Sequence, residues 1–209
     1  EASGYASPVV TKLGEDSRML IFNGKRLTLI DPADGKVFDQ YDWKTSHNVN
    51  AALPLVMGGN IFISSGYNQG CAMLAVKEGK FVETWRNRNM NNHFNSCIHV
   101  DGFLYGFDGN TGSDAFRCID AATGEVRWTQ SWLGIGSLVH AGGHLLVLSE
   151  KGELVVVRPT PEAFTPTYRL QILNGQCWTS PALCDGRLYA RTAEGELVCY
   201  DFNHLAKKG

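Results

Sequence analysis

A turn phrase of about ten residues recurs along this chain and constrains the fold more than any other feature of the sequence. In its clearest copy, residues 119–128, a strand ends at Asp120, a tight turn contains Thr123 and Gly124, and a second strand ends at Trp128. An Asp before such a turn accepts backbone N–H groups, and glycine allows the positive φ that the turn often requires. Further copies occupy residues 29–38, 74–85 and, in part, 195–201.

A second phrase precedes each copy and consists of a short strand, a turn with glycine and an apolar strand. Aligned on one equivalent position, the units follow one another at steps of 46, 43, 41 and 43 residues. A steady period near forty with four short strands per unit is typical of a β-propeller, in which each unit is a blade. The equivalent positions are Pro8, Pro54, Cys97, Leu138 and Pro181.

The repeat predicts an all-β chain, a β-propeller array of four-stranded antiparallel blades that forms one domain over residues 1–209. The chain holds about four and three-quarter blades, because the last unit stops after its third strand. Two closures are open: part of a larger ring, or a closed five-bladed propeller in which the N-terminus supplies the last strand. An open array exposes an apolar blade face and strand edges, so something should cover both ends. The blades are expected at about residues 7–46, 53–88, 96–132, 137–173 and 180–202.

The indole that ends the turn phrase requires a docking partner, because a bare hairpin is too shallow to bury it. Trp85 and Trp128 hold this position in the second and third units. In the first unit the position is Asp39, so Phe38 or Trp43 is expected to take the role. The predicted structural docking residues are Asp120, Gly124, Trp128 and Trp85.

The charge balance excludes two classes of partner. The chain has 19 basic and 21 acidic residues, a formal net charge of −2, so no global field attracts nucleic acid or an anionic membrane. No stretch approaches the roughly 18 apolar residues of a membrane span. The six cysteines include no CxxC and no adjacent pair, and three of them fall in apolar strands, where a thiol packs as a small hydrophobe.

Residues 120–128 closely resemble the tryptophan-docking phrase of the quinoprotein-like β-propellers, whose repeats are named after pyrroloquinoline quinone (PQQ). Residues 85–96 and 175–181 resemble, more specifically, exported bacterial proteins with these repeats, which are related to the propeller lipoprotein of outer-membrane protein assembly. The resemblance covers essentially the whole chain. It implies an eight-bladed ring of roughly twice this length and a periplasmic or secreted location.

Quinoprotein dehydrogenases of this fold hold the quinone over adjacent cysteines and bind calcium through acidic and amide side chains. This chain has no adjacent cysteines and no matching set of Glu, Asn and Asp. We therefore predict no catalytic residue, no metal and no cofactor. PQQ and calcium are expected only if the chain belongs to a dehydrogenase.

The connections from one blade's outer strand to the next blade's inner strand are polar and aromatic, and in propellers they lie on the face that usually holds ligands. Convergent amides, imidazoles and an indole can bind a sugar, a peptide or a planar ring. The alternative is that Asn and His satisfy the loop backbone. The candidate binding residues are His47, Asn48, Asn50, Arg86, Arg88, Asn92, His93, Asn95, Gln176 and Trp178.

Two spacings suggest metals but have simpler interpretations. His140 and His144 are spaced as zinc ligands, but Gly142 and Gly143 between them predict a hairpin and no third ligand is present. Residues 108–114 resemble the start of a calcium loop, yet they lack its bidentate Glu, and a polar hairpin tip is expected instead.

Two functions of different classes follow. The favoured hypothesis is a non-catalytic scaffold that presents its loop face to a protein, peptide or glycan, with the remaining blades or another protein as partner. The alternative is a PQQ-dependent alcohol or sugar dehydrogenase, or its remnant, with catalytic residues on missing blades. An intact structural repeat beside an absent catalytic set favours the first.

Overall fold

The computed structural model describes residues 2–109 and 114–202 and confirms the all-β propeller fold. The strands form five antiparallel sheets in which neighbours in sequence are neighbours in space, and no α-helix occurs in the described residues. The first two blades contain β1 (Val9–Leu13), β2 (Asp16–Phe22), β3 (Arg26–Ile30), β4 (Val37–Asp42), β5 (Leu55–Met57), β6 (Asn60–Ser65), β7 (Gly70–Lys77) and β8 (Lys80–Asn87). The other three contain β9 (Ile98–Val100), β10 (Phe103–Asp108), β11 (Ala115–Asp120), β12 (Val126–Gln130), β13 (Ser137–Ala141), β14 (His144–Leu148), β15 (Glu153–Arg158), β16 (Thr165–Gln171), β17 (Ala182–Cys184), β18 (Arg187–Arg191) and β19 (Leu197–Asp201).

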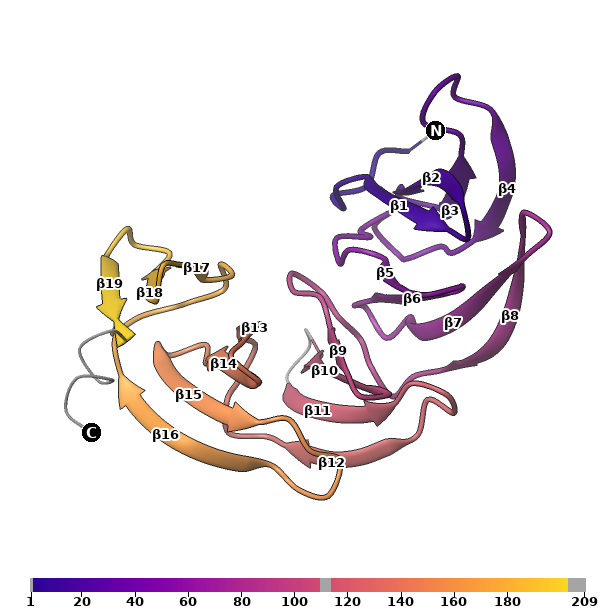
Figure 1. Ribbon diagram of the computed structural model, residues 1–209. Helices are drawn as coiled ribbons and strands as arrows, with labels where there is room; N and C mark the ends of the chain where they lie inside the picture. The colour runs from indigo at the N-terminus through magenta and orange to yellow at the C-terminus, as the bar shows by residue number, and fades with distance from the viewer. Residues whose placement is uncertain (1, 110–113, 203–209) are drawn as a thin grey trace.

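The five sheets fan out as an open arc (Figure 1). The inner strands β1, β5, β9, β13 and β17 face the concave side, and the outer strands β4, β8, β12 and β16 face the convex side. The first and last sheets lie at opposite ends of the arc, and β17, β18 and β19 are the only described strands of the last sheet. The closed five-bladed alternative is therefore wrong, because the N-terminal strand β1 belongs to the first sheet and adds no strand to the last one.

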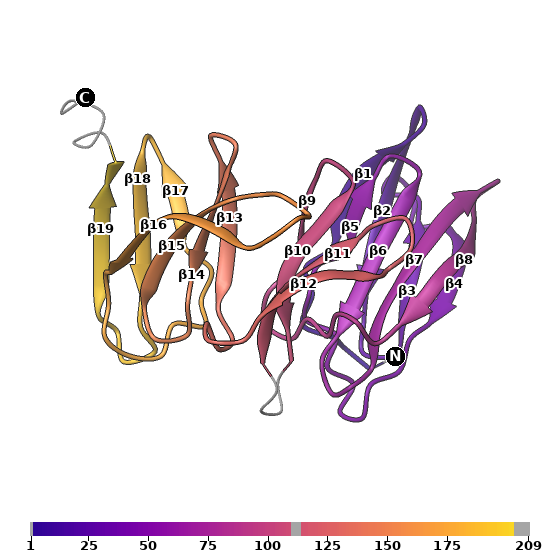
Figure 2. The same ribbon diagram turned by 90° about the horizontal axis from the view of Figure 1, so that it is seen from below.

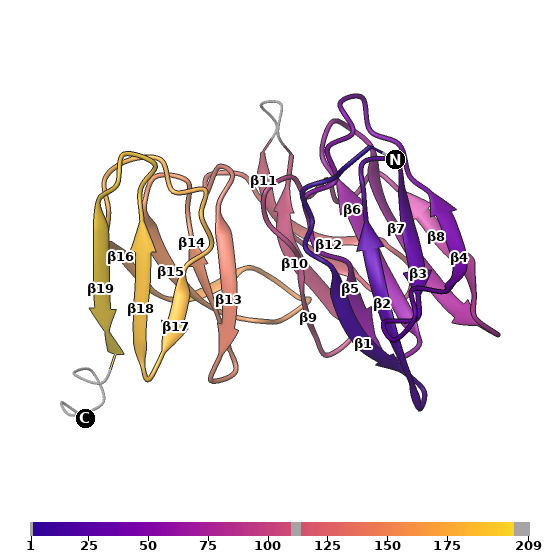
Figure 3. The same ribbon diagram turned by 90° about the horizontal axis from the view of Figure 1, so that it is seen from above.

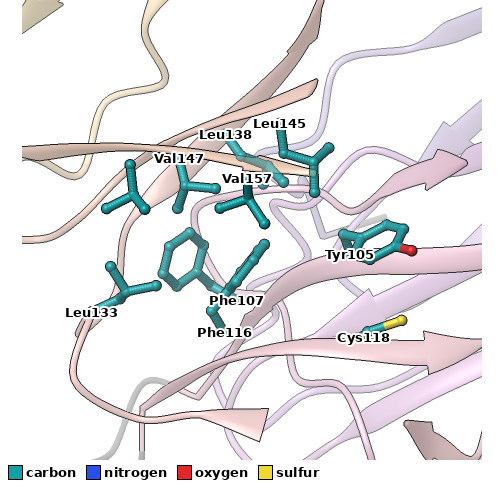
Figure 4. Close-up of a cluster of buried hydrophobic side chains, with 10 residues drawn as sticks. Tyr105, Phe107, Phe116, Cys118, Leu133, Leu138, Leu145, Val147 and Val157 are labelled. Atoms are coloured by element: carbon teal, nitrogen blue, oxygen red, sulfur yellow. The ribbon is translucent and has the colours of Figure 1, made fainter. Parts of the chain in front are cut away.

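The hydrophobic core lies between the blades. Each cluster of buried apolar side chains in the described residues combines two neighbouring sheets. Between the third and fourth blades, for example, Phe107 and Phe116 face Val147 and Val157 (Figure 4). Sheets that are covered on both faces need no strict alternation of polar and apolar residues, which explains the continuous apolar strand β14.

A β-bulge in each four-stranded blade carries the contact to the next blade. The register between the third and outer strands shifts by one residue, so the outer strand bends at that point. The residue after the bulge reaches the following blade in every case. In the fourth blade the hydroxyl oxygen of Tyr168 lies 3.1 Å from that of Tyr200. The residues that follow the bulge are Asp39, Trp85, Trp128 and Tyr168.

The two indoles at this position bond to the backbone of the next blade. The Nε1–H group of Trp85 donates to the carbonyl oxygen of Ala121 at 3.1 Å, and that of Trp128 donates to the carbonyl oxygen of Thr160 at 2.8 Å. Buried indole N–H groups usually find such an acceptor. The apolar ring and the polar N–H therefore act together to fix the distance between neighbouring blades.

The turn that receives Trp85 has the structure that its residues suggest. A carboxylate oxygen of Asp120 accepts from the backbone N–H groups of Ala122 and Thr123 at 2.8 and 3.1 Å. Gly124 has φ +74°, and a Cβ atom there would lie 2.7 Å from the ring of Trp85. Glycine at this position thus allows both the turn and the close approach of the indole.

In the first blade the residue after the bulge is not aromatic. Asp39 fills the position, because its carboxylate accepts from the backbone N–H of Phe81 in the second blade at 2.7 Å. Trp43, one of the two residues expected to dock here, is fully buried between the first two blades, and its Nε1–H group donates to Ser65 Oγ at 3.0 Å. A charged acceptor suits a backbone N–H donor, as the indole N–H of the later blades suits a backbone carbonyl.

No helix long and apolar enough to span a membrane is found in the described part of the chain.

Candidate functional site: the link face

The candidate site lies on one side of the array, which we call the link face. It comprises the connections between blades, residues 43–54, 88–97, 131–136 and 172–181, together with the hairpins between the second and third strands of the first, second, fourth and fifth blades. In a side view these segments gather along one edge of the five sheets, at the bottom of Figure 2 and at the top of Figure 3. Sequence segments more than a hundred residues apart therefore meet on this face.

Several predicted amides point inward and hold the links in place. Asn50 is fully buried: its Nδ2 donates to the carbonyl oxygens of Asn23 and Trp43 at 2.8 and 3.2 Å, and its Oδ1 accepts from Ser65 Oγ at 2.6 Å. This network ties the first link to the hairpin between β2 and β3. The amide of Asn50 is fully occupied and is not available to a ligand.

Asn92 plays the same part in the second link. Its backbone N–H donates to Ser64 Oγ at 2.8 Å and its Nδ2 donates to the carbonyl oxygen of Phe107 at 2.9 Å. Its Oδ1 accepts from Cys97 Sγ at 3.2 Å and lies buried with the neighbouring Asn95. Burial raises the pKa of the Cys97 thiol, so this sulfur remains a neutral donor.

The other polar candidates make separate contacts. The guanidinium of Arg86 lies 4.4 Å from the ring centroid of Trp43, a cation–π contact on the outer strand. Arg88 is exposed. Asn48 adopts φ +56°, and the carbonyl oxygen of Gln176 accepts from a backbone N–H at 2.8 Å. None of the four lines the concavity described below.

Three of the predicted residues belong to a continuous row of rings, which we call the aromatic ladder. Its ring centroids are separated by 5.1 Å between His47 and Tyr67, 5.0 Å between Tyr67 and His93, 3.8 Å between His93 and Phe94, and 5.3 Å between Phe94 and Trp178. The last pair is stacked at 27°. The ladder joins the first link to the last across the link face. Sequence reasoning missed Tyr67, which lies in a hairpin, and Phe94, which stands among amides.

The ladder is uncharged along its middle. The side chain of His93 is 7% exposed, and neither ring nitrogen has a hydrogen-bond partner in the described structure. Burial lowers its pKa below the usual 6.5, so the imidazole is neutral at pH 7. At the last rung, the Nε1–H group of Trp178 donates to Glu150 Oε1 at 3.0 Å, which fixes the indole and leaves its face 37% exposed.

A concavity of about 350 Å³ adjoins the ladder at the starts of the inner strands. Phe94 belongs to both and is 47% exposed. No lining side chain carries a formal charge. The lining residues are Tyr5, Ser7, Ala51, Leu53, Phe94, Asn95, Ser96, Cys97, Ile98, Leu138 and Ser180.

The described residues contain no cluster of three or more side chains that could ligate a metal ion. His140 and His144 flank a hairpin with positive φ at Gly142 and Gly143. The centre of the calcium-like stretch, residues 110–113, lies outside the described residues. At its start, the carboxylate of Asp108 pairs with Arg117 at 2.7 Å.

The fold defines a class: the chain is a β-propeller array of PQQ-like repeats. The family model for outer membrane protein assembly factor BamB matches residues 1–130 and 112–207, and the chain belongs to this family. Its structure is similar to that of BamB from Moraxella catarrhalis, with 16% sequence identity and a TM-score of 0.71. That match covers 95% of this chain and 59% of the other, so the chain spans about three fifths of the BamB structure it resembles. No curated protein sequence matches this chain.

Proposed function

We propose that this chain is part of a non-catalytic scaffold that binds another protein through its link face. The observation that carries the proposal is the aromatic ladder, in which rings from three links and one hairpin meet beside an uncharged concavity. Exposed aromatic rings that lie side by side, as those of Phe94 and Trp178 do, are costly in water and are typical of interaction surfaces. Membership of the family of an outer-membrane assembly factor supports a partner that is itself a protein.

The chemistry of the face supports binding rather than catalysis. Its amides at Asn50 and Asn92 are committed to internal hydrogen bonds, and Glu150 accepts from Trp178. His93, a natural candidate for a general base, is packed between two rings, and neither of its ring nitrogens has a hydrogen-bond partner in the described structure. The described side chains of this face hold the loops in place and present aromatic rings.

The family supports a cellular setting for this function. We propose that the protein lies in the cell envelope, that the remaining blades of a larger ring complete the arc, and that it binds no nucleic acid because the net charge is −2. The competing dehydrogenase hypothesis predicts turnover when PQQ and calcium are added with ethanol or glucose and an artificial electron acceptor. Sustained reduction of the acceptor would overturn the scaffold proposal.

A photocrosslinking experiment tests the proposed face. The photoreactive amino acid p-benzoylphenylalanine is placed at Trp178 and, as a matched control, at Val126, which is similarly exposed but lies at the start of the outer strand β12, outside the link face. After irradiation in the protein's own cells, we expect position 178 to give a discrete adduct whose mass spectrum identifies a peptide of a second protein. No adduct at position 178, or the same adducts at both positions, would contradict the proposal.

A further inference from the structure

Exposed apolar side chains are concentrated beside the aromatic ladder. Twelve large hydrophobic residues are exposed in the described chain, and four of them lie together here. Tyr5 (73% exposed), Leu53 (43%) and Phe94 line the concavity, and Trp178 stacks on Phe94. Such a group next to a hollow is the usual arrangement of a site that takes up an apolar side chain.

Phe94 and Trp178 form a ledge for a flat group. Their rings are nearly parallel, at 27° with centroids 5.3 Å apart, and both are part-exposed. The hydrogen bond from Trp178 Nε1 to Glu150 fixes the indole, and His93 supports Phe94 from below at a centroid distance of 3.8 Å. A rigid aromatic surface of this kind binds a further ring with little loss of side-chain entropy.

The lining of the concavity restricts what can enter it. It contains no charged side chain, so a phosphate or carboxylate would lose its hydration without a compensating charge. The hydroxyl-bearing residues Ser7 and Ser180 are exposed at its rim, where they can bond to peptide N–H and C=O groups.

The same lining disfavours a glycan. Vicinal sugar hydroxyls are best held by planar amide or charged side chains, which bond to two hydroxyls at once. The single amide here, Asn95, is 4% exposed and already accepts from Asn92 Nδ2 at 3.4 Å. Leu53, Ile98 and Leu138 also line the concavity, whose exposed surface is more polar than apolar, so it offers hydrogen bonds to a peptide backbone together with apolar contacts for a side chain.

We propose, resting on the scaffold function above, that the ladder and the concavity bind an extended, uncharged peptide segment of a partner protein. An aromatic side chain of the segment stacks on the ledge of Phe94 and Trp178. Its neighbour enters the concavity between Tyr5 and Leu53, while the peptide backbone bonds to the hydroxyls at the rim.

The test uses the 209-residue chain with ¹⁵N-labelled tryptophan and a defined probe. The probe is the capped peptide acetyl-Gly-Ser-Phe-Gly-Tyr-Ser-Gly-amide. Its comparison peptides carry Glu or Ser in place of both aromatic residues, and chitohexaose represents a neutral glycan. We expect the aromatic peptide to shift the indole N–H signal of Trp178 while those of Trp43 and Trp85, which are remote from the ledge, stay in place. The comparison peptides should bind at least about tenfold more weakly, because they lack the aromatic side chain that stacks on the ledge.

Three variants separate this site from the rest of the surface. Phe94→Ala and Trp178→Ala should each weaken binding of the aromatic peptide by about tenfold or more, whereas Trp132→Ala should change it less than twofold. Because the Phe94→Ala chain keeps all five indoles, unchanged Trp43 and Trp85 signals show that the variant is folded.

Three results would overturn the peptide proposal: unchanged peptide affinity in both ladder variants, tighter binding of chitohexaose than of the peptide, or no binding of the peptide at millimolar concentration. These failures are distinguishable from failure of the scaffold proposal. A protein adduct at position 178 in cells, combined with no peptide binding, would reject only the extended uncharged segment as the mode of recognition.

Discussion

Replacing Trp43 tests the argument that the blades are held together by side chains inserted between neighbouring sheets. This indole is fully buried between the first and second blades, donates to Ser65 Oγ at 3.0 Å and lies under the guanidinium of Arg86. Removing a buried Trp side chain costs about 3–5 kcal/mol. That loss is a large part of the roughly 5–15 kcal/mol by which a domain is stable.

A second variant separates packing from hydrogen bonding. Trp43→Phe keeps most of the ring and removes the N–H donor, while Ser65 keeps its own hydrogen bond to Asn50. We expect a loss of about 1–2 kcal/mol for Trp43→Phe and about 4 kcal/mol for Trp43→Ala. The control, Trp132→Ala, removes an indole that is 41% exposed and should cost less than about 1 kcal/mol.

The assay is equilibrium unfolding in urea followed by far-ultraviolet circular dichroism, which does not depend on the removed fluorophore. The free energy of unfolding is compared between variants at an unchanged m value. A loss below about 1 kcal/mol for Trp43→Ala would refute the view that this indole fastens the first two blades. Equal losses for the Phe and Ala variants would instead assign the effect to the hydrogen bond alone.

Three further predictions concern the turns, the ladder and the thiols. Gly124→Ala should destabilise the protein by about 3 kcal/mol, because Cβ would meet the docked indole; Gly35→Ala, at a similar positive φ with open space, should cost about 1–2 kcal/mol in the same urea assay. Burial holds the pKa of His93 below 6.5, so the unfolded chain binds more protons and stability falls as the pH drops below about 6.5; His93→Phe should reduce this slope in thermal melts. With Ellman's reagent, Cys184 and Cys199 are exposed and should react at once, and the other four thiols only after unfolding; six fast thiols would contradict the packing.

The repeat in the sequence carries most of the fold, because a blade needs only short apolar strands and turn residues at a fixed period. The docking position is harder to predict. It depends on a bulge that moves one residue out of register, so Asp39 and Tyr168 occupy the place of an indole without resembling one. The register shift and the hydrogen-bond partner on the next blade together reveal that the four residues are equivalent.

The sequence predicted three residues of the ladder and missed the other two. His47, His93 and Trp178 lie in the links, where polar and aromatic residues indicate a candidate binding surface. Tyr67 and Phe94 join them only through contacts between segments far apart in the chain. The internal hydrogen bonds of Asn50 and Asn92 were equally hard to predict, since they depend on which backbone groups lie at a crossing between sheets and need a partner.

The contacts made by the residues after the bulges all run from one blade to the next blade along the chain. The outer strand of an earlier blade always reaches the third strand of the next blade or the residues that follow it, and no such contact runs backwards in the described chain. A polypeptide that leaves the ribosome N-terminus first therefore presents each anchor before its receptor is synthesised. Docking is therefore directional along the chain: each blade supplies the anchor, and the blade that follows it supplies the receptor.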